Sequence, residues 1–154
     1  YSDSLSGYFD REIAPGWTAQ VAEVRRILQE EADLQEIVRL VGVDALALKD
    51  RMTLEAARSI REDYLHQIAF DEVDTYTSPK KQYGMLKLIL TWYHKGEEAV
   101  AAEVPFEQIL TMPAVEKIGR LKRGPEDQWD AHYAAVAGEL ESQFAALMEE
   151  ENHA

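Results

Sequence analysis

Histidines and carboxylates are the side chains of this sequence that could hold a metal ion. Four histidines accompany 29 aspartates and glutamates, at His66, His94, His132 and His153. A carboxylate-bridged di-iron bundle needs two Glu-x-x-His motifs and further glutamates on facing helices. The nearest approach is the run from Asp63 to His66, and one imperfect match among so many acids is expected by chance. The spacing therefore predicts no metal site and leaves a bundle metalloenzyme as a poorly supported alternative.

Phosphate-binding motifs are missing from the sequence. No Gly-x-x-x-x-Gly-Lys-[Ser/Thr] run is present, and no Gly-Lys pair occurs anywhere. Without that loop there is no nest of backbone amides to hold a triphosphate. The dinucleotide glycine pattern and the Gly-x-Ser-x-Gly nucleophile elbow are absent too. We therefore expect no catalytic residue in this chain and no ATP hydrolysis by the chain alone.

Two aromatic side chains, Phe70 and Tyr76, follow the end of a predicted helix and suit a different chemistry. An aromatic face can stack on a nucleotide base without any contribution from charge. The same rings are equally suited to a place in a hydrophobic core at a helix end. The residue pattern by itself favours the core interpretation.

The elements that would position these residues are predicted by apolar spacing. Val24, Ile27, Leu34, Val38 and Val41 recur at three- and four-residue intervals, with Glu31 as the one polar residue in register. Leu54, Ala57, Ile60 and Tyr64 repeat the pattern further along. Gly42 is a plausible helix stop between the two sets. The pattern predicts two antiparallel helices whose connecting turn, 41–50, forms an exposed tip.

The remaining pattern extends this pair into an all-α helical bundle with short loops. Predicted helices cover residues 19–41, 49–69, 79–102, 106–110, 114–123 and 126–150. Residues 1–17 form an irregular lead-in, because Pro15-Gly16 interrupts any helix. Residues 18–150 form the bundle domain, and residues 151–154 form a frayed tail.

The amino-acid composition argues against several classes of binding partner. The net charge of the 154-residue chain is −13, which argues against a nucleic-acid interface and against docking on an anionic membrane. There is no cysteine, which suits a reducing cytoplasm. No apolar run approaches the roughly 20 residues that span a bilayer, and the N-terminus does not resemble a signal peptide. A cytoplasmic location without membrane insertion follows as an expectation.

Three runs of residues give the sequence a family resemblance. They are LQEIVRLVGVDAL at 34–46, ARSIREDYLHQIAF at 57–70 and VDTY at 73–76. Lys81-Gln82-Tyr83, 85–90, Val104-Pro105 and 116–120 continue it. This pattern resembles the C-terminal domain of the catalytic A subunit of V/A-type rotary ATPases. The resemblance implies a nucleotide-binding domain before Tyr1, joined through the lead-in 1–17.

The resemblance also implies a role for the segment after the second helix. Gln67, Ala69 and Phe70 would form the rim of an adenine pocket, and Tyr76 would add a second aromatic wall. The usually polar position before the alanine is Ile68 here, which removes one expected contact. ATP or ADP with magnesium would bind the full-length subunit, whereas the fragment alone would bind no cofactor.

For the 41–50 tip, the resemblance implies contact with the central rotor shaft. The candidate contacts are Asp44, Leu46 and Leu48, in place of the acidic DELSEED-like run of the related F-type β subunit. The partners of the full subunit would be B subunits in an alternating A/B hexamer. This hexamer would lie peripheral to the membrane. The alternatives are an ordinary turn whose leucines fold into the core, and a free-standing acidic scaffold module. The sequence does not decide whether the enzyme works as a synthase or as a pump, or whether it moves protons or sodium ions.

Overall fold

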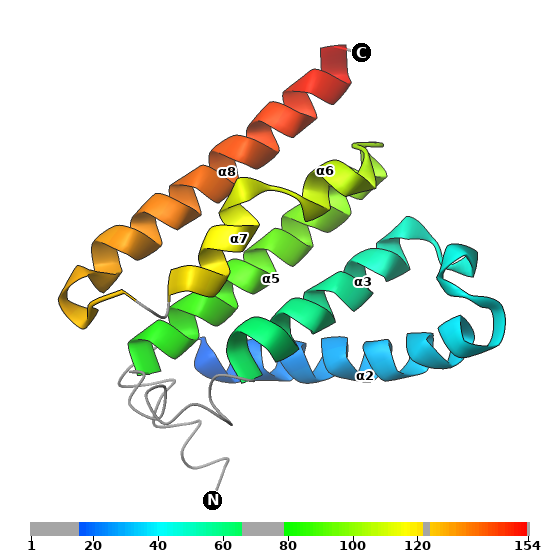
Figure 1. Cartoon of the computed structure of the whole chain (residues 1–154), viewed down its shortest axis with the longest axis horizontal. Helices are drawn as coiled ribbons and strands as arrows, with labels where there is room; N and C mark the ends of the chain where they lie inside the picture. The colour runs from blue at the N-terminus through cyan, green and yellow to red at the C-terminus, as the bar shows by residue number, and fades with distance from the viewer. Residues whose placement is uncertain (1–15, 66–78, 122–123, 154) are drawn as a thin grey trace, which may run out of the picture.

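The computed structural model of the chain describes residues 16–65, 79–121 and 124–153. Within these ranges the secondary structure is entirely helical (Figure 1), which confirms the predicted all-α bundle. The α-helices are α2 (Trp17–Val41), α3 (Leu48–Ser59), α5 (Pro79–Ala101), α6 (Phe106–Leu110), α7 (Pro113–Arg120) and α8 (Trp129–His153). None of them combines the length and the apolar character required of a membrane span.

Helix α2 is bounded by two glycines with left-handed φ angles. Gly16 precedes it with φ 96°, and Gly42 follows it with φ 91° and donates its N–H to the Val38 carbonyl at 2.8 Å. Gly42 is therefore the predicted helix stop, at a conformation that other residues rarely adopt. The helix begins at Trp17, two residues earlier than expected, because the left-handed glycine lies at position 16.

The second arm of the hairpin differs from the single helix predicted for 49–69. After the 3₁₀ turn η2 (Val43–Ala45), α3 covers Leu48–Ser59 and passes into the π-helical turn η3 (Ile60–Leu65). Its antiparallel partner is α2, and η2 with its flanking residues joins the two helices at the end that projects from the body in Figure 1. The rest of the predicted helix, 66–69, lies outside the described residues.

Helix α5 lies at the centre of the molecule. The α2–α3 hairpin packs on one side of it, and α7 and α8 pack on another (Figure 1). Its side chains are buried around most of the helix circumference, including Leu86, Ile89, Trp92 and Tyr93. A helix that is apolar on nearly all sides belongs in a core, and this one supplies the largest share of it.

Two close approaches fix the layers around α5. A Cβ on Gly84 would lie 2.6 Å from a ring carbon of Trp129 and 3.2 Å from the ring of Tyr133, both on α8. A Cβ on Gly96 would overlap the end of the fully buried Met52 side chain on α3. Glycine at both positions lets the neighbouring helices approach closely.

The C-terminal region follows the prediction with shifted ends. The short helix α6 has the predicted bounds, 106–110. Helix α7 ends at Arg120 rather than Arg123, and residues 122–123 are not described. A 3₁₀ turn, η6 (Glu126–Gln128), precedes α8, which continues to His153 through most of the tail predicted to fray.

Candidate functional site

The exposed end of the α2–α3 hairpin carries an apolar surface. Its members are large apolar residues with substantial exposure: Ile37 (43%), Leu40 (79%), Val41 (66%), Val43 (39%) and Leu48 (42%). We call this set the apolar tip. Among the described residues, every exposed large hydrophobic side chain belongs to it. Concentration of such side chains at one projecting end is typical of an interaction site.

Backbone geometry explains which side chains point outward. Gly42 ends α2 and starts the turn, and the chain leaves η2 through Leu46 in an extended conformation (φ −85°, ψ 144°). Leu46 is thereby turned inward and is only 9% exposed, whereas Leu48 begins α3 and is 42% exposed. Leu46 is therefore buried and not exposed as expected, but it is not one of the side chains of the main hydrophobic core.

Leu40 was not predicted as a surface residue, and Val41 and Val43, although they lie in the predicted tip 41–50, were not among its named contacts. Val41 was also placed in the buried seam, because it keeps the spacing of Leu34 and Val38. The seam is buried only as far as Glu31, and Leu34 and Val38 are half-buried. The available signal was the run Leu-Val-Gly-Val itself, since apolar residues flanking a turn glycine contradict the usual polarity of exposed turns.

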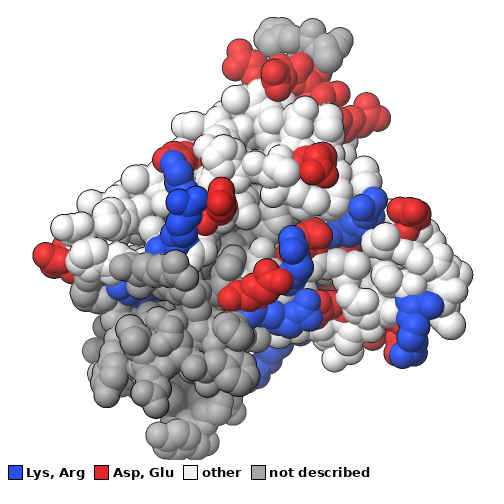
Figure 2. Space-filling view, in the orientation of Figure 1, with Lys and Arg blue, Asp and Glu red and all other residues white. Residues whose placement is uncertain are grey.

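Charge around the apolar tip is sparse and mixed. Arg39 pairs with Glu36 on α2, and Asp44 is exposed in the turn. Figure 2 shows the hairpin end as mostly uncharged surface with a few side chains of both signs, whereas acidic side chains gather at the C-terminal end of α8. The tip is therefore suited to contact through packing more than through charge.

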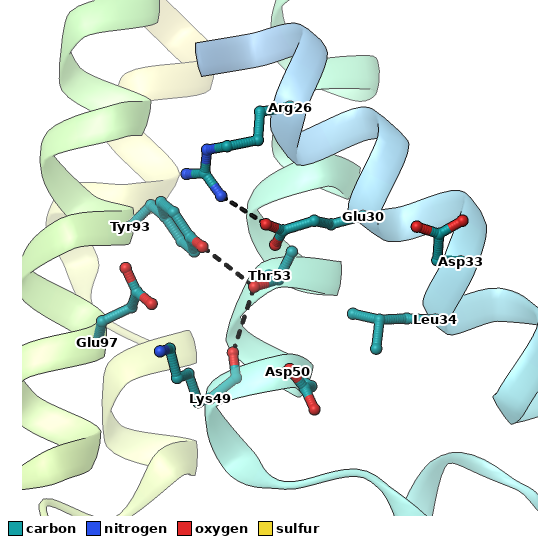
Figure 3. A pocket seen from close by; sticks show the side chains of 9 residues that line it. All are labelled: Arg26, Glu30, Asp33, Leu34, Lys49, Asp50, Thr53, Tyr93 and Glu97. Atoms are coloured by element: carbon teal, nitrogen blue, oxygen red, sulfur yellow. Dashed lines mark hydrogen bonds and ion pairs between the residues drawn. The ribbon is translucent and has the colours of Figure 1, made fainter.

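A polar cleft of about 380 Å³ lies between the hairpin and α5. Six charged side chains and two hydroxyls line it, together with Leu34 (Figure 3): Arg26, Glu30, Asp33, Lys49, Asp50, Glu97, Thr53 and Tyr93. Arg26 donates to Glu30 at 2.6 Å, and the hydroxyls of Thr53 and Tyr93 are 3.1 Å apart. Partial burial opposes the charge of Arg26, but hydrogen bonds from its guanidinium to Glu30 and Tyr93 raise its pKa above the ordinary value.

Two pairs of side chains in the cleft are hydrogen-bonded to each other, Arg26 with Glu30 and Thr53 with Tyr93. Thr53 also donates to the Lys49 carbonyl at 3.3 Å, so its hydroxyl is satisfied within α3 as well as across to α5. In the described parts of the chain, no three His, Asp or Glu side chains are grouped closely enough to hold a metal ion. His94, one of the candidate ligands, instead pairs with Glu23 of α2.

Burial also acts on a tyrosine on the opposite side of α5. Desolvation, with a smaller contribution from Tyr83, raises the pKa of Tyr133 above its ordinary value of 10.0. Tyr133 packs against Trp129 with ring centroids 5.7 Å apart. The phenol therefore stays neutral in the folded protein over the physiological range.

The four residues predicted for an adenine pocket, Gln67, Ala69, Phe70 and Tyr76, lie outside the described residues. So does His66, the histidine of the imperfect metal motif. Of the residues predicted to contact a rotor, the structure exposes Asp44 and Leu48 and buries Leu46. The described part of the site is therefore the hairpin, with an apolar tip at its end and a polar cleft at its side.

Comparison with known sequences places this hairpin in a recognisable context. Residues 6–110 match the sequence model of the C-terminal domain of V and A type ATP synthase. The V-type ATP synthase alpha chain of Acetivibrio thermocellus is 53% identical over 151 residues, covering 98% of this chain and 26% of the relative. The corresponding chain of Thermoanaerobacter pseudethanolicus is 48% identical over 97% of this chain and 24% of its own length.

The similarity extends to a differently named relative. The A subunit of the A-type ATP synthase of Thermococcus onnurineus is 46% identical over 147 residues, which is 96% of this chain and 25% of that protein. The chain thus spans about a quarter of the length of the curated relatives it matches.

Proposed function

The chain belongs to the family of C-terminal domains of V- and A-type ATP synthases, and from that premise we propose that it acts within a longer catalytic A subunit. In that subunit it closes the adenine side of the nucleotide pocket and couples the pocket to a central rotor. ATP or ADP with magnesium is held by a preceding domain, and B subunits alternate with A subunits around the rotor. The assembly is cytoplasmic and peripheral to the membrane.

The observation that carries the coupling role is the apolar tip. A hairpin of two long helices places five exposed apolar side chains at its far end. An apolar, well-packed contact can transmit displacement without any ion pair, because packed side chains resist compression. We therefore propose that the tip contacts the rotor by packing, through Leu40, Val41, Val43 and Leu48, with Asp44 at its edge. Leu46 supports the turn from inside.

The adenine role depends on residues outside the described ranges. Family membership supports it, together with the motif around Gln67, Ala69, Phe70 and Tyr76. The chain has no phosphate-binding loop, so its contribution is to the base end of the nucleotide and not to phosphate chemistry. For the same reason, we expect the chain alone not to turn over ATP.

The coupling role is tested by changing the tip in the assembled enzyme. Leu40→Ser with Val41→Ser should lower ion transport per ATP hydrolysed, because the packing contact with the rotor is lost. Unfolding of the 154-residue chain should change by no more than about 0.5 kcal/mol per site, as is usual for exposed positions. Ion flux and ATP hydrolysis, measured together in reconstituted vesicles, give the coupling ratio.

Leu46→Ala is the matched control, because Leu46 lies in the same turn but is buried. It should lower the free energy of unfolding by about 2 kcal/mol or more, as large-to-small changes of buried leucines do. A normal coupling ratio in the double serine variant would show that the tip does not contact the rotor.

A further inference from the structure

The polar cleft and the apolar tip share one face of helix α2. This face carries residues spaced three or four positions apart: Arg26, Glu30, Asp33, Ile37 and Leu40. Side chains at these intervals are neighbours along a helix surface. The first three line the cleft, and the last two belong to the apolar tip. From Asp33 to Ile37 the rise along the helix is only about 6 Å, so the two features form one continuous surface.

Three helices enclose the cleft. Figure 3 shows α2 on one side, α5 on the other and α3 between them. The deepest lining residues are Thr53 and Tyr93, both 2% exposed. The charged lining residues are exposed or half-buried, so they remain accessible to a group that enters from solvent.

Negative charge in the cleft exceeds positive charge. Arg26 and Glu30 neutralise each other at 2.6 Å. The other charged lining residues are three acids and one base: Asp33, Asp50, Glu97 and Lys49. A partly enclosed group of this composition concentrates negative potential.

Most of these four side chains have no charged partner of their own. Asp33 accepts a hydrogen bond from the uncharged amide of Gln29 at 3.3 Å. In the part of the chain that the structure describes, no hydrogen bond or ion pair engages the Lys49 ammonium or the carboxylates of Asp50 and Glu97. The cleft therefore holds carboxylates that are available to a cation from outside the chain.

We infer that the partner of the apolar tip places a lysine or arginine side chain in this cleft. The inference rests on the proposed contact between the tip and a rotor, and it specifies the chemistry of the rotor surface as an apolar patch with a basic residue beside it. Charge complementarity selects a cation as the occupant. Continuity between the cleft and the tip along α2 assigns that cation to the same partner. The apolar contact supplies packing, and the cleft fixes the register of the partner on the hairpin.

The experiment measures the Kd between the central rotor and the ring of A and B subunits of the assembled enzyme, at low ionic strength. Asp50→Asn with Glu97→Gln in the full-length A subunit should raise the Kd by about three- to fivefold, the upper part of the range for an ion pair in contact with water. Near 1 M salt the difference should shrink, because charges are then screened beyond about 3 Å. An unchanged Kd at low salt would overturn the inference.

Glu55→Gln with Glu98→Gln is the matched control. It removes one carboxylate from each of the same two helices, α3 and α5, at positions outside the cleft. The net charge changes by the same amount, and the Kd should change by less than about twofold, as expected of exposed charges. An equal rise in both double variants would overturn the inference, since total charge and not the cleft would then control binding.

Lys49→Gln should have the opposite effect. Lys49 is the base that shares the cleft with the available acids, so its removal leaves more negative charge for the incoming cation. The Kd should fall by about two- to threefold at low salt. Damage to the hairpin would weaken binding, so tighter binding is not the result of a purely structural role. A Kd that is unchanged or raised in Lys49→Gln would overturn the inference.

Leu40→Ser with Val41→Ser separates this inference from the function on which it rests. A raised Kd in this variant beside an unchanged Kd in the cleft variant would overturn the basic side chain and leave the tip contact intact. Unchanged Kd values in both would overturn both. Raised values in both, with only the effect of the cleft variant reduced by salt, are the result that supports the inference.

Discussion

Phe70 is the side chain whose removal best separates a nucleotide contact from a core aromatic. If its ring lies against adenine, Phe70→Ala in the full-length subunit should cost about 1–3 kcal/mol of binding, the range for base-stacking rings. The KM for ATP should then rise by about one to two orders of magnitude with kcat largely kept. Phe70→Trp should restore much of the affinity, because it returns a flat aromatic face.

The core alternative for Phe70 has a different signature. A buried Phe→Ala change costs about 3–5 kcal/mol of folding free energy, and it does so without any nucleotide. Chemical denaturation of the 154-residue chain therefore complements the kinetic measurement. A strongly destabilised chain beside an unchanged KM would end the adenine assignment.

The paired hydroxyls of Thr53 and Tyr93 connect α3 to α5 within the core. Both residues are 2% exposed, and their oxygens are 3.1 Å apart. Tyr93→Phe should lower the free energy of unfolding by about 1 kcal/mol, because Thr53 keeps its second partner, the Lys49 carbonyl. A double-mutant cycle with Thr53→Val measures the coupling. A coupling energy near zero would mean that the two hydroxyls contribute independently.

Residue types predicted less of the site than the resemblance did. Phe70 and Tyr76 are ordinary helix-end aromatics by pattern, and only the motif around them suggests adenine. The inward turn of Leu46 could not be predicted, because it depends on the extended backbone that follows η2. Spacing along a helix does not determine the direction of a side chain in a turn.

Close helix packing at α5 depends on the absence of a side chain at Gly84. Gly84→Ala should destabilise the chain, because the new methyl group would meet the rigid, 4% exposed Trp129 ring. Overpacking of this kind costs about 1–3 kcal/mol, which exceeds the gain of up to about 1 kcal/mol in helix propensity. Thermal or chemical denaturation of the variant and the unmodified chain measures the difference.

Gly138→Ala in α8 is the matched comparison. No atom lies within 4 Å of the position that a Cβ would take there, so only the helix propensity changes. The variant should be more stable by up to about 1 kcal/mol. Equal effects at positions 84 and 138 would show that contact with Trp129 does not limit the approach of α8 to α5.

Helix positions were predictable, whereas their ends and internal irregularities were not. Apolar spacing located α2, α5 and α8 within a few residues, since each buries one face or most of its surface, whereas α6 was located by the prolines at 105 and 113 that bracket it. The π-helical turn at Ile60–Leu65 interrupts a stretch that the pattern assigned to one helix. Apolar residues keep intervals of three and four through this stretch, at Leu54, Ala57, Ile60 and Tyr64, so their periodicity does not reveal the turn.

The bundle as a whole was predictable because α5 is apolar on most sides and needs neighbours on each. The exposed apolar tip was not predictable. Apolar residues on one face of a helix have the same spacing whether that part of the helix packs against the core or extends beyond it. Burial of α2 ends at Glu31, and the ten residues that follow carry the seam outward. The exposed seam is as long as the part of the hairpin that extends beyond the core.

An apolar end on a strongly acidic molecule has a consequence for its colloidal behaviour. With a net charge of −13, copies of the chain repel one another at low ionic strength. Salt shortens the range of this repulsion from about 30 Å at 0.01 M to about 3 Å at 1 M. The attraction between apolar tips is not weakened in the same way, so concentrated salt should bring copies together end to end.

Sedimentation velocity across a salt series measures this association. We expect a single slow species at low salt and a faster one near 1 M sodium sulfate, which strengthens apolar burial. Leu40→Ser should suppress the faster species, since it removes the most exposed apolar side chain of the tip. If association persists in that variant, the copies associate through a surface other than the apolar tip. If Leu40→Ser suppresses the association, the surface proposed to contact a rotor also sets the ionic conditions under which the domain stays in solution.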